Sequence, residues 1–160
     1  MKEKIYIETT VVSYLAARPA RDVVLLARQQ LTAEFWDWSK SEYLLCCSPL
    51  TKQEAARGDQ IVASRRLTFL KECSDLSYSM EAEELARDLI KLKAIPKSEP
   101  EDAVHIALAT VANVKYIATW NFSHMASPQA KRLLEKAITE LGFVSPLIAT
   151  PEEIYESEAR

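Results

Sequence analysis

One stretch of the chain combines an acidic beginning with a face of small apolar side chains: Pro100-Glu101-Asp102-Ala103-Val104-His105-Ile106-Ala107-Leu108-Ala109-Thr110. Pro100 suits the first turn of a helix, where the missing N–H group costs nothing. The positions that recur at helical spacing are Ala103, Ile106, Ala107 and Thr110. Because most of these side chains are small, the predicted helix can lie close against a sheet, with Asp102 in its first turn near the sheet edge.

Asp102 by itself is open to two interpretations. Acidic residues are common in the first turn of a helix because they complement the helix dipole, and they need no further role. The functional interpretation depends on companions elsewhere in the chain. Three candidates follow predicted strands: Glu8, Glu54 and Asn121.

Elements of strand and helix character alternate along the chain. Short apolar runs predict strands at residues 5–7, 43–48, 76–78, 116–120 and 146–149, of which 76–78 is the weakest. Helical patterns separate them, and such alternation predicts a parallel α/β sheet with helices on both faces. Ligands of such sheets bind beyond the carboxyl ends of the strands, so Glu8, Glu54, Asp102 and Asn121 are expected to converge there.

Length and composition are those of a globular domain. With 160 residues, 48% of them hydrophobic and 27% charged, we expect one domain over residues 1–150 and an acidic tail over 151–160. No apolar run has the length of a membrane span, and the start of the chain lacks the features of a signal peptide, so a cytoplasmic protein is expected. The two glycines are too few for a glycine-rich phosphate-binding loop.

The available ligands favour an oxygen-bound metal. Two histidines and three cysteines without zinc-binding spacing argue against a site built on nitrogen or sulfur, which leaves Mg²⁺ or Mn²⁺. Clustered carboxylates repel one another unless a cation neutralises them, and such an ion can activate water for phosphodiester hydrolysis. His105 lies three positions after Asp102 and can reach the site, although such a histidine is more often packed within the fold.

Four motifs in register resemble those of PIN-domain proteins, and the closest subgroup is the VapC-like ribonucleases of bacterial toxin–antitoxin pairs. The resemblance covers nearly the whole chain. It implies a three-layer α/β/α sandwich with a mainly parallel five-stranded sheet in the order 3-2-1-4-5, a Mg²⁺ or Mn²⁺ site, endonucleolytic cleavage of RNA, homodimers and a small antitoxin partner. The motifs are Ile5-Tyr6-Ile7-Glu8-Thr9-Thr10-Val11-Val12-Ser13-Tyr14-Leu15, Glu54, Glu101-Asp102-Ala103-Val104-His105-Ile106-Ala107 and Thr119-Trp120-Asn121-Phe122.

The resemblance also assigns roles to individual residues. It implies that Glu8, Glu54 and Asp102 are metal ligands. These three and Asn121 are then the expected catalytic residues, and Asn121 positions water or a phosphate oxygen. Glu8 stands where the family usually has an aspartate, and Asn121 stands where many members have another. Glu8 keeps the charge on a longer side chain, whereas Asn121 loses a charge, which weakens metal binding.

Two other functions compete with the metal-dependent ribonuclease. A PIN-fold module with this altered site could bind RNA or a protein without cutting, and metal-dependent turnover separates the two. A phosphorylation-receiver domain also places acids at strand ends. It requires a phospho-accepting aspartate on the middle strand and a lysine partner, and neither stands at the expected strand ends, so this alternative ranks last.

Overall fold

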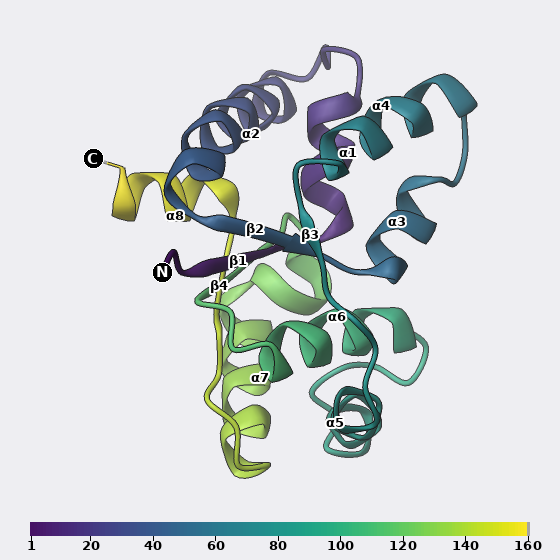
Figure 1. Ribbon diagram of the computed structural model, residues 1–160, viewed down its shortest axis with the longest axis vertical. Helices are drawn as coiled ribbons and strands as arrows, with labels where there is room; N and C mark the ends of the chain where they lie inside the picture. Colours follow the sequence, from purple (N-terminus) through teal and green to yellow (C-terminus); the bar gives the residue numbers. More distant parts are fainter. Residues whose placement is uncertain (160) are drawn as a thin grey trace.

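The computed structural model describes residues 1–159, and its centre is a five-stranded sheet (Figure 1). The strands lie in the order β3-β2-β1-β4-β5, and every neighbouring pair is parallel. Fold class and strand order are therefore confirmed, with a sheet that is wholly rather than mainly parallel. The strands are β1 (Lys4–Ile7), β2 (Leu44–Cys47), β3 (Ser74–Asp75), β4 (Tyr116–Ala118) and β5 (Leu147–Ala149).

Most helices begin at a side chain that accepts a hydrogen bond from the backbone of the first turn. Asp22, Ser48, Asp59, Ser79 and Ser127 are such caps, and they fix where the chain turns into each helix. The helices are α1 (Thr9–Ala16), α2 (Val23–Glu42), α3 (Pro49–Ala55), α4 (Gln60–Leu70), α5 (Met80–Lys91), α6 (Pro100–Val111), the π-helical turn η1 (Phe122–Ala126), α7 (Pro128–Glu140) and α8 (Pro151–Glu158).

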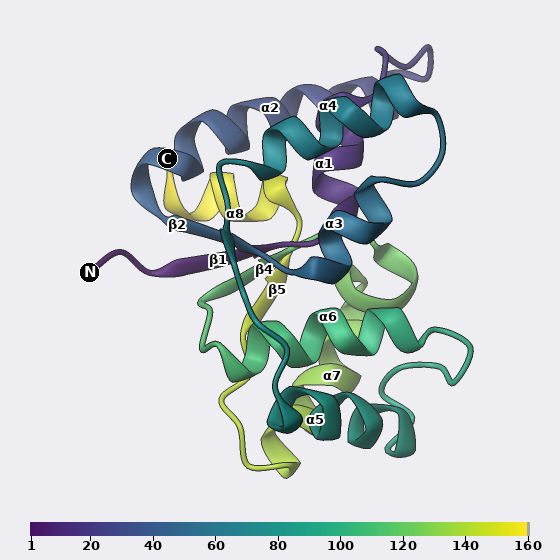
Figure 2. The same cartoon turned by 45° about the vertical axis from the view of Figure 1, so that its right-hand side comes forward.

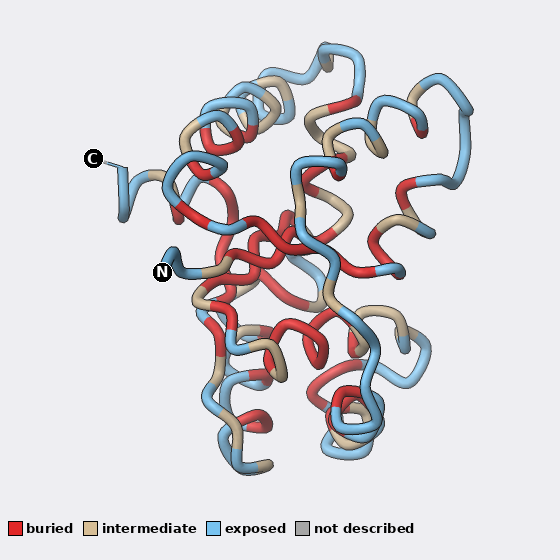
Figure 3. The backbone as a smooth tube through the Cα atoms, viewed as in Figure 1, coloured by how far each residue is buried: buried red, intermediate tan, exposed pale blue. Residues whose placement is uncertain are grey.

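The helices form two layers, one on each face of the sheet (Figure 2). Side chains alternate along β1, so Ile5 and Ile7 pack with α1, α2, α4 and α8, whereas Tyr6 packs with α5, α6 and α7. This is the predicted three-layer sandwich. Figure 3 shows that burial is concentrated on the strands and on the helix faces that meet them.

Helix α6 has the close-packed face that its sequence predicts. Ala103, Ile106, Ala107 and Thr110 are all at most 1% exposed. The small side chains bring α6 close to the sheet and hold its first turn, with Asp102, beside the carboxyl ends of the strands.

The strand predicted at residues 76–78 is wrong by a few positions. The strand β3 is only Ser74 and Asp75, paired with Cys46 and Cys47, and the N–H of Leu76 adds one more hydrogen bond to Cys47. Both residues of β3 are exposed, so no apolar run marks this edge strand.

The segment expected to be an acidic tail forms α8. Its Ile154 is fully buried among side chains of α2 and its neighbours. The division into a domain of residues 1–150 and a tail stays a prediction. No helix among the described residues has the length and apolar character that crossing a membrane requires.

Candidate metal centre

Glu8 lies directly after β1 and caps helix α1. Its backbone N–H continues the sheet by donating to Ala118 (3.1 Å), and its side chain is folded back onto the helix start. The Oε1 atom accepts from the backbone and hydroxyl of Thr10 and from the Thr119 hydroxyl (2.7 Å). Glu8 is thus held in one position, while Oε2 accepts none of these bonds and is available to a cation.

Glu54 lies near the end of the short helix α3 and faces the start of α1. Its Oε1 accepts from the Thr9 hydroxyl (2.5 Å) and from Nε2 of His105 (2.6 Å). Burial opposes the charged form, but the hydrogen bond and charge of His105, helped by Thr9 and Arg57, outweigh it and hold the pKa of Glu54 below its usual value. Glu54 is therefore an ionised carboxylate at neutral pH.

His105 is fully buried and connects Glu54 to the core. Its Nδ1 lies 2.6 Å from the hydroxyl of Tyr6, which also contacts the hydroxyls of Ser48 (2.9 Å) and Thr51 (3.2 Å). Burial lowers the pKa of His105, but Glu54 and the other nearby carboxylates raise it more, so the net shift is upward. This buried hydrogen-bond chain fixes the imidazole ring and thereby the carboxylate that it contacts.

Asp102 stands in the first turn of α6, beside the loop that follows β4. Its Oδ2 accepts from Nδ2 of Asn121 (3.3 Å), while Oδ1 of Asn121 accepts from the backbone of His124 (3.0 Å). Burial raises the pKa of Asp102, and the charge of Glu8 raises it further, against the hydrogen bond from Asn121. A bound cation would relieve this cost by neutralising the pair of acids.

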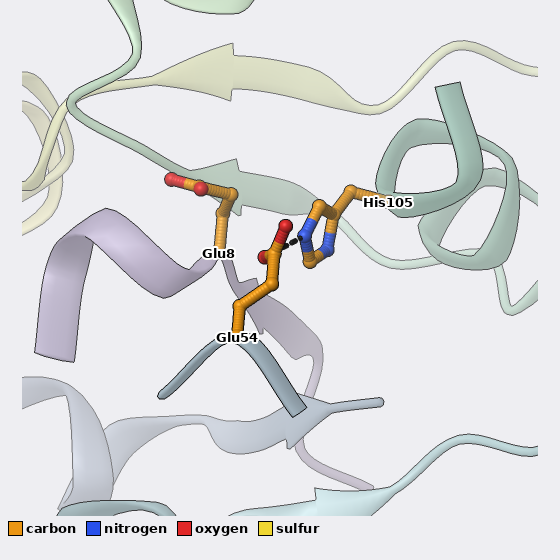
Figure 4. Close-up of side chains that lie close together, drawn as sticks. All are labelled: Glu8, Glu54 and His105. Atoms are coloured by element: carbon orange, nitrogen blue, oxygen red, sulfur yellow. Dashed lines mark hydrogen bonds and ion pairs between the residues drawn. The ribbon is translucent and has the colours of Figure 1, made fainter. Parts of the chain in front are cut away.

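The predicted residues all lie at the carboxyl edge, but in two groups. Among the described residues, ligand atoms within 4.8 Å of one another are those of Glu8, Glu54 and His105 (Figure 4), and those of Glu99, Asp102 and His124. Glu8, Glu54 and Asp102 do not form one such group, although the charge of Glu8 raises the pKa of Asp102. Asn121 turns its nitrogen toward Asp102 and uses its oxygen to cap η1.

His105 is packed and hydrogen-bonded within the fold, as is more common for such a histidine, and it also contacts the candidate ligand Glu54. The spacing of three positions between Asp102 and His105 was the available signal, because it places both on nearly one face of α6. Glu99 was not among the residues singled out in the sequence. Glu99 immediately precedes the helix and lies 3.9 Å from Nε2 of His124 through its Oε1. No pattern in the sequence marks that contact.

The residues present fit a hard divalent cation. Glu8 offers Oε2, Asp102 offers a carboxylate whose charge burial disfavours, and Glu54 is fixed as an anion nearby. Carboxylate oxygens are the ligands that Mg²⁺ and Mn²⁺ prefer. The acidic and histidine groups can therefore hold a metal ion, and the arrangement does not select between the two ions.

We expect Glu54→Gln to destabilise the metal-free protein most between about pH 4.5 and 6.5. The raised pKa of His105 means that its stabilising contact is complete below its ordinary value of 6.5 and is lost as pH rises through the raised value. The lowered pKa of Glu54 means that its contribution is complete above 4.5 and is lost as pH falls through the lowered value. Urea unfolding in EDTA across this range measures the difference.

The exposed acid Glu84 on α5 provides the control, because Glu84→Gln removes a charge without touching His105. The raised pKa of Asp102 affects the stability of the parent protein and of the Glu54→Gln variant alike, so its effect cancels when their unfolding free energies are compared. A loss of stability that is the same at every pH would contradict an ionic contact between Glu54 and His105.

Comparison with known proteins links the chain to a solved structure. No family model and no curated protein sequence matches it. The fold is similar to that of a chain in the crystal structure of VapBC2 from Rickettsia felis bound to a DNA fragment from their promoter, with a TM-score of 0.60 and 11% identity over 92% of this chain and 98% of that chain. The chain therefore has a PIN-like α/β fold, as its four motifs led us to expect.

Proposed function

We propose that the chain is a Mg²⁺- or Mn²⁺-dependent endoribonuclease. The supporting observation is that acids from separate segments, Glu8 after β1, Glu54 on α3 and Asp102 on α6, lie at the carboxyl edge of the sheet, in two groups of possible metal ligands. A metal bound there would lower the pKa of a bound water and neutralise charge on a phosphate. The fold alone does not distinguish a nuclease from a binding module; the acidic edge favours the nuclease.

The residues of the site divide the work in this proposal. Glu8 and Asp102 would hold the metal. Glu54 is fixed by His105 and Thr9, and it would orient the attacking water or act as a metal ligand through that water. Asn121 holds the Asp102 carboxylate in place through Nδ2. The resemblance to PIN-domain proteins led us to expect that Asn121 positions water or a phosphate oxygen. We propose the smaller role of holding Asp102, because the Asn121 side-chain oxygen already accepts a hydrogen bond from the backbone of η1.

We also propose that the protein is the toxin of a toxin–antitoxin pair, acts on cytoplasmic RNA, forms homodimers and is restrained by a small antitoxin. The support is the likeness in fold to a chain of VapBC2, which was crystallised with a DNA fragment from its promoter. The alternative is a PIN-fold module with weakened catalysis that binds RNA or a protein. The loss of one charge at Asn121 favours that alternative, because fewer charges hold a metal less tightly.

The test is cleavage of a panel of single-stranded and structured RNAs with Mn²⁺, Mg²⁺ or EDTA. We expect cutting with either ion and none in EDTA. Metal binding is measured in parallel by calorimetry. Absence of both cutting and metal binding would favour the binding module, whereas cutting that persists in EDTA would contradict metal-dependent chemistry.

A further inference from the structure

A cation on α2 lies over aromatic rings beside the proposed metal centre. The guanidinium carbon of Arg28 is 4.9 Å from the centre of the Phe122 ring and 5.6 Å from that of the Trp120 ring. Both distances are those of cation–π contacts. These two aromatic residues flank Asn121, which contacts Asp102. Arg28 on α2 therefore lies close to the edge of the proposed metal centre.

The Trp120 ring beneath Arg28 is held in place by packing and by a hydrogen bond. Trp120 is only 4% exposed, its indole N–H donates to the Thr32 hydroxyl (2.9 Å), and its ring stacks on Tyr14 at 5.3 Å with an angle of 6°. Its backbone N–H donates to the hydroxyl of Thr10 (2.8 Å), which in turn donates to Glu8. The Trp120 residue over which Arg28 lies is therefore connected through hydrogen bonds to Glu8, one of the proposed metal ligands.

Arg28 differs from Lys52 and Arg57, two basic residues near the carboxyl edge, in having no acidic partner among the described residues. Lys52 contacts Asp75 at 2.7 Å, and Arg57 contacts Glu101 at 3.1 Å. Over residues 1–159, no carboxylate lies within 4.0 Å of the Arg28 guanidinium. The guanidinium N–H groups of Arg28 have no hydrogen-bond acceptor among the described residues, and a guanidinium fork matches phosphate oxygens.

We propose that Arg28, held on Trp120 and Phe122, binds a backbone phosphate of single-stranded RNA next to the phosphate that is cut. Phe122 is 39% exposed and adds a ring face against which a base of the same strand can stack. The inference rests on the proposed ribonuclease function and adds a binding position to it. Here Arg28 binds substrate outside the metal centre and takes no part in bond breaking.

The test measures binding of a short fluorescein-labelled single-stranded RNA of mixed sequence, by anisotropy in EDTA, over a salt series that begins at low salt. We expect Arg28→Gln to weaken binding about tenfold, because a charge-assisted hydrogen bond is lost. The slope of log affinity against log salt should fall by about 0.7, as for one phosphate contact on a single strand. Arg28→Lys should keep the slope but lose part of the affinity, since an ammonium group has no planar face for stacking.

Lys136→Gln is the matched control, because it removes one positive charge from an exposed position on α7. Thermal unfolding of each variant separates loss of binding from loss of fold. Equal affinity and slope for Arg28→Gln and Lys136→Gln would overturn the inference, as would a parent protein that binds the RNA no better than Arg28→Gln. Arg28-dependent binding by a protein that neither cuts RNA nor binds Mn²⁺ would support the phosphate contact of Arg28 while favouring the binding module over the nuclease.

Discussion

Asp102→Asn is expected to lower metal-dependent RNA cleavage on the order of a thousandfold and to leave the fold intact. A metal ion contributes several kcal/mol of transition-state stabilisation, and losing about 4 kcal/mol of it corresponds to this factor. Asparagine has nearly the same shape as aspartate, so packing at the start of α6 is retained. What is lost is the negative charge on which metal binding depends.

The same substitution should not destabilise the metal-free protein. The pKa of Asp102 is raised by burial and by the charge of Glu8, so the ionised carboxylate is held at a cost in the folded state. Replacing it with a neutral amide removes that cost. We therefore expect the urea midpoint in EDTA to be equal to or higher than that of the parent, whereas the stabilisation of the parent by Mn²⁺ should disappear.

This prediction is tested by three measurements: the rate of RNA cleavage, urea unfolding in EDTA, and thermal unfolding with added Mn²⁺. Asp37→Asn is the control, because the Asp37 side chain is 80% exposed on α2 and contacts only Lys40 among the described ion pairs. Full cleavage by Asp102→Asn would remove Asp102 from the site. A strongly destabilised variant would instead show that the carboxylate has a structural role.

Ala107→Leu is expected to cost about 1–3 kcal/mol of unfolding free energy and to weaken metal binding. Ala107 is fully buried where α6 packs against the sheet, and added methyl groups in a filled core force side chains and backbone to shift. Alanine and leucine both favour helix, so propensity contributes little. Because α6 also bears Asp102 and His105, its displacement moves both relative to Glu8 and Glu54.

Urea unfolding gives the change in stability, and the shift of the unfolding temperature with Mn²⁺ gives the change in metal binding. Ala33→Leu on α2 makes the same change at an exposed helical position and should have little effect on either. A stable Ala107→Leu protein with unchanged response to Mn²⁺ would show that the close approach of α6 to the sheet does not matter to the site.

Much of the fold follows from local patterns in the sequence. Alternating apolar runs and helical periodicities predicted the parallel sheet, and the small side chains of α6 predicted its close packing. These predictions succeed because periodicity reports which face of an element is buried, and that face depends on neighbours along the chain. The strand β3 was misplaced because two exposed residues have no such pattern.

The resemblance of the motifs to those of PIN-domain proteins implied the strand order, and the alternation of strands and helices in the sequence indicated the edge at which Glu8, Glu54, Asp102 and Asn121 would lie. Only the tertiary structure decided which of them contact. Glu54 and His105 are 51 positions apart, and His105 and Tyr6 are 99 apart, yet hydrogen bonds of 2.6 Å join each pair. Such contacts depend on how separate helices pack against the sheet, to within a fraction of an ångström, and no local pattern records that distance.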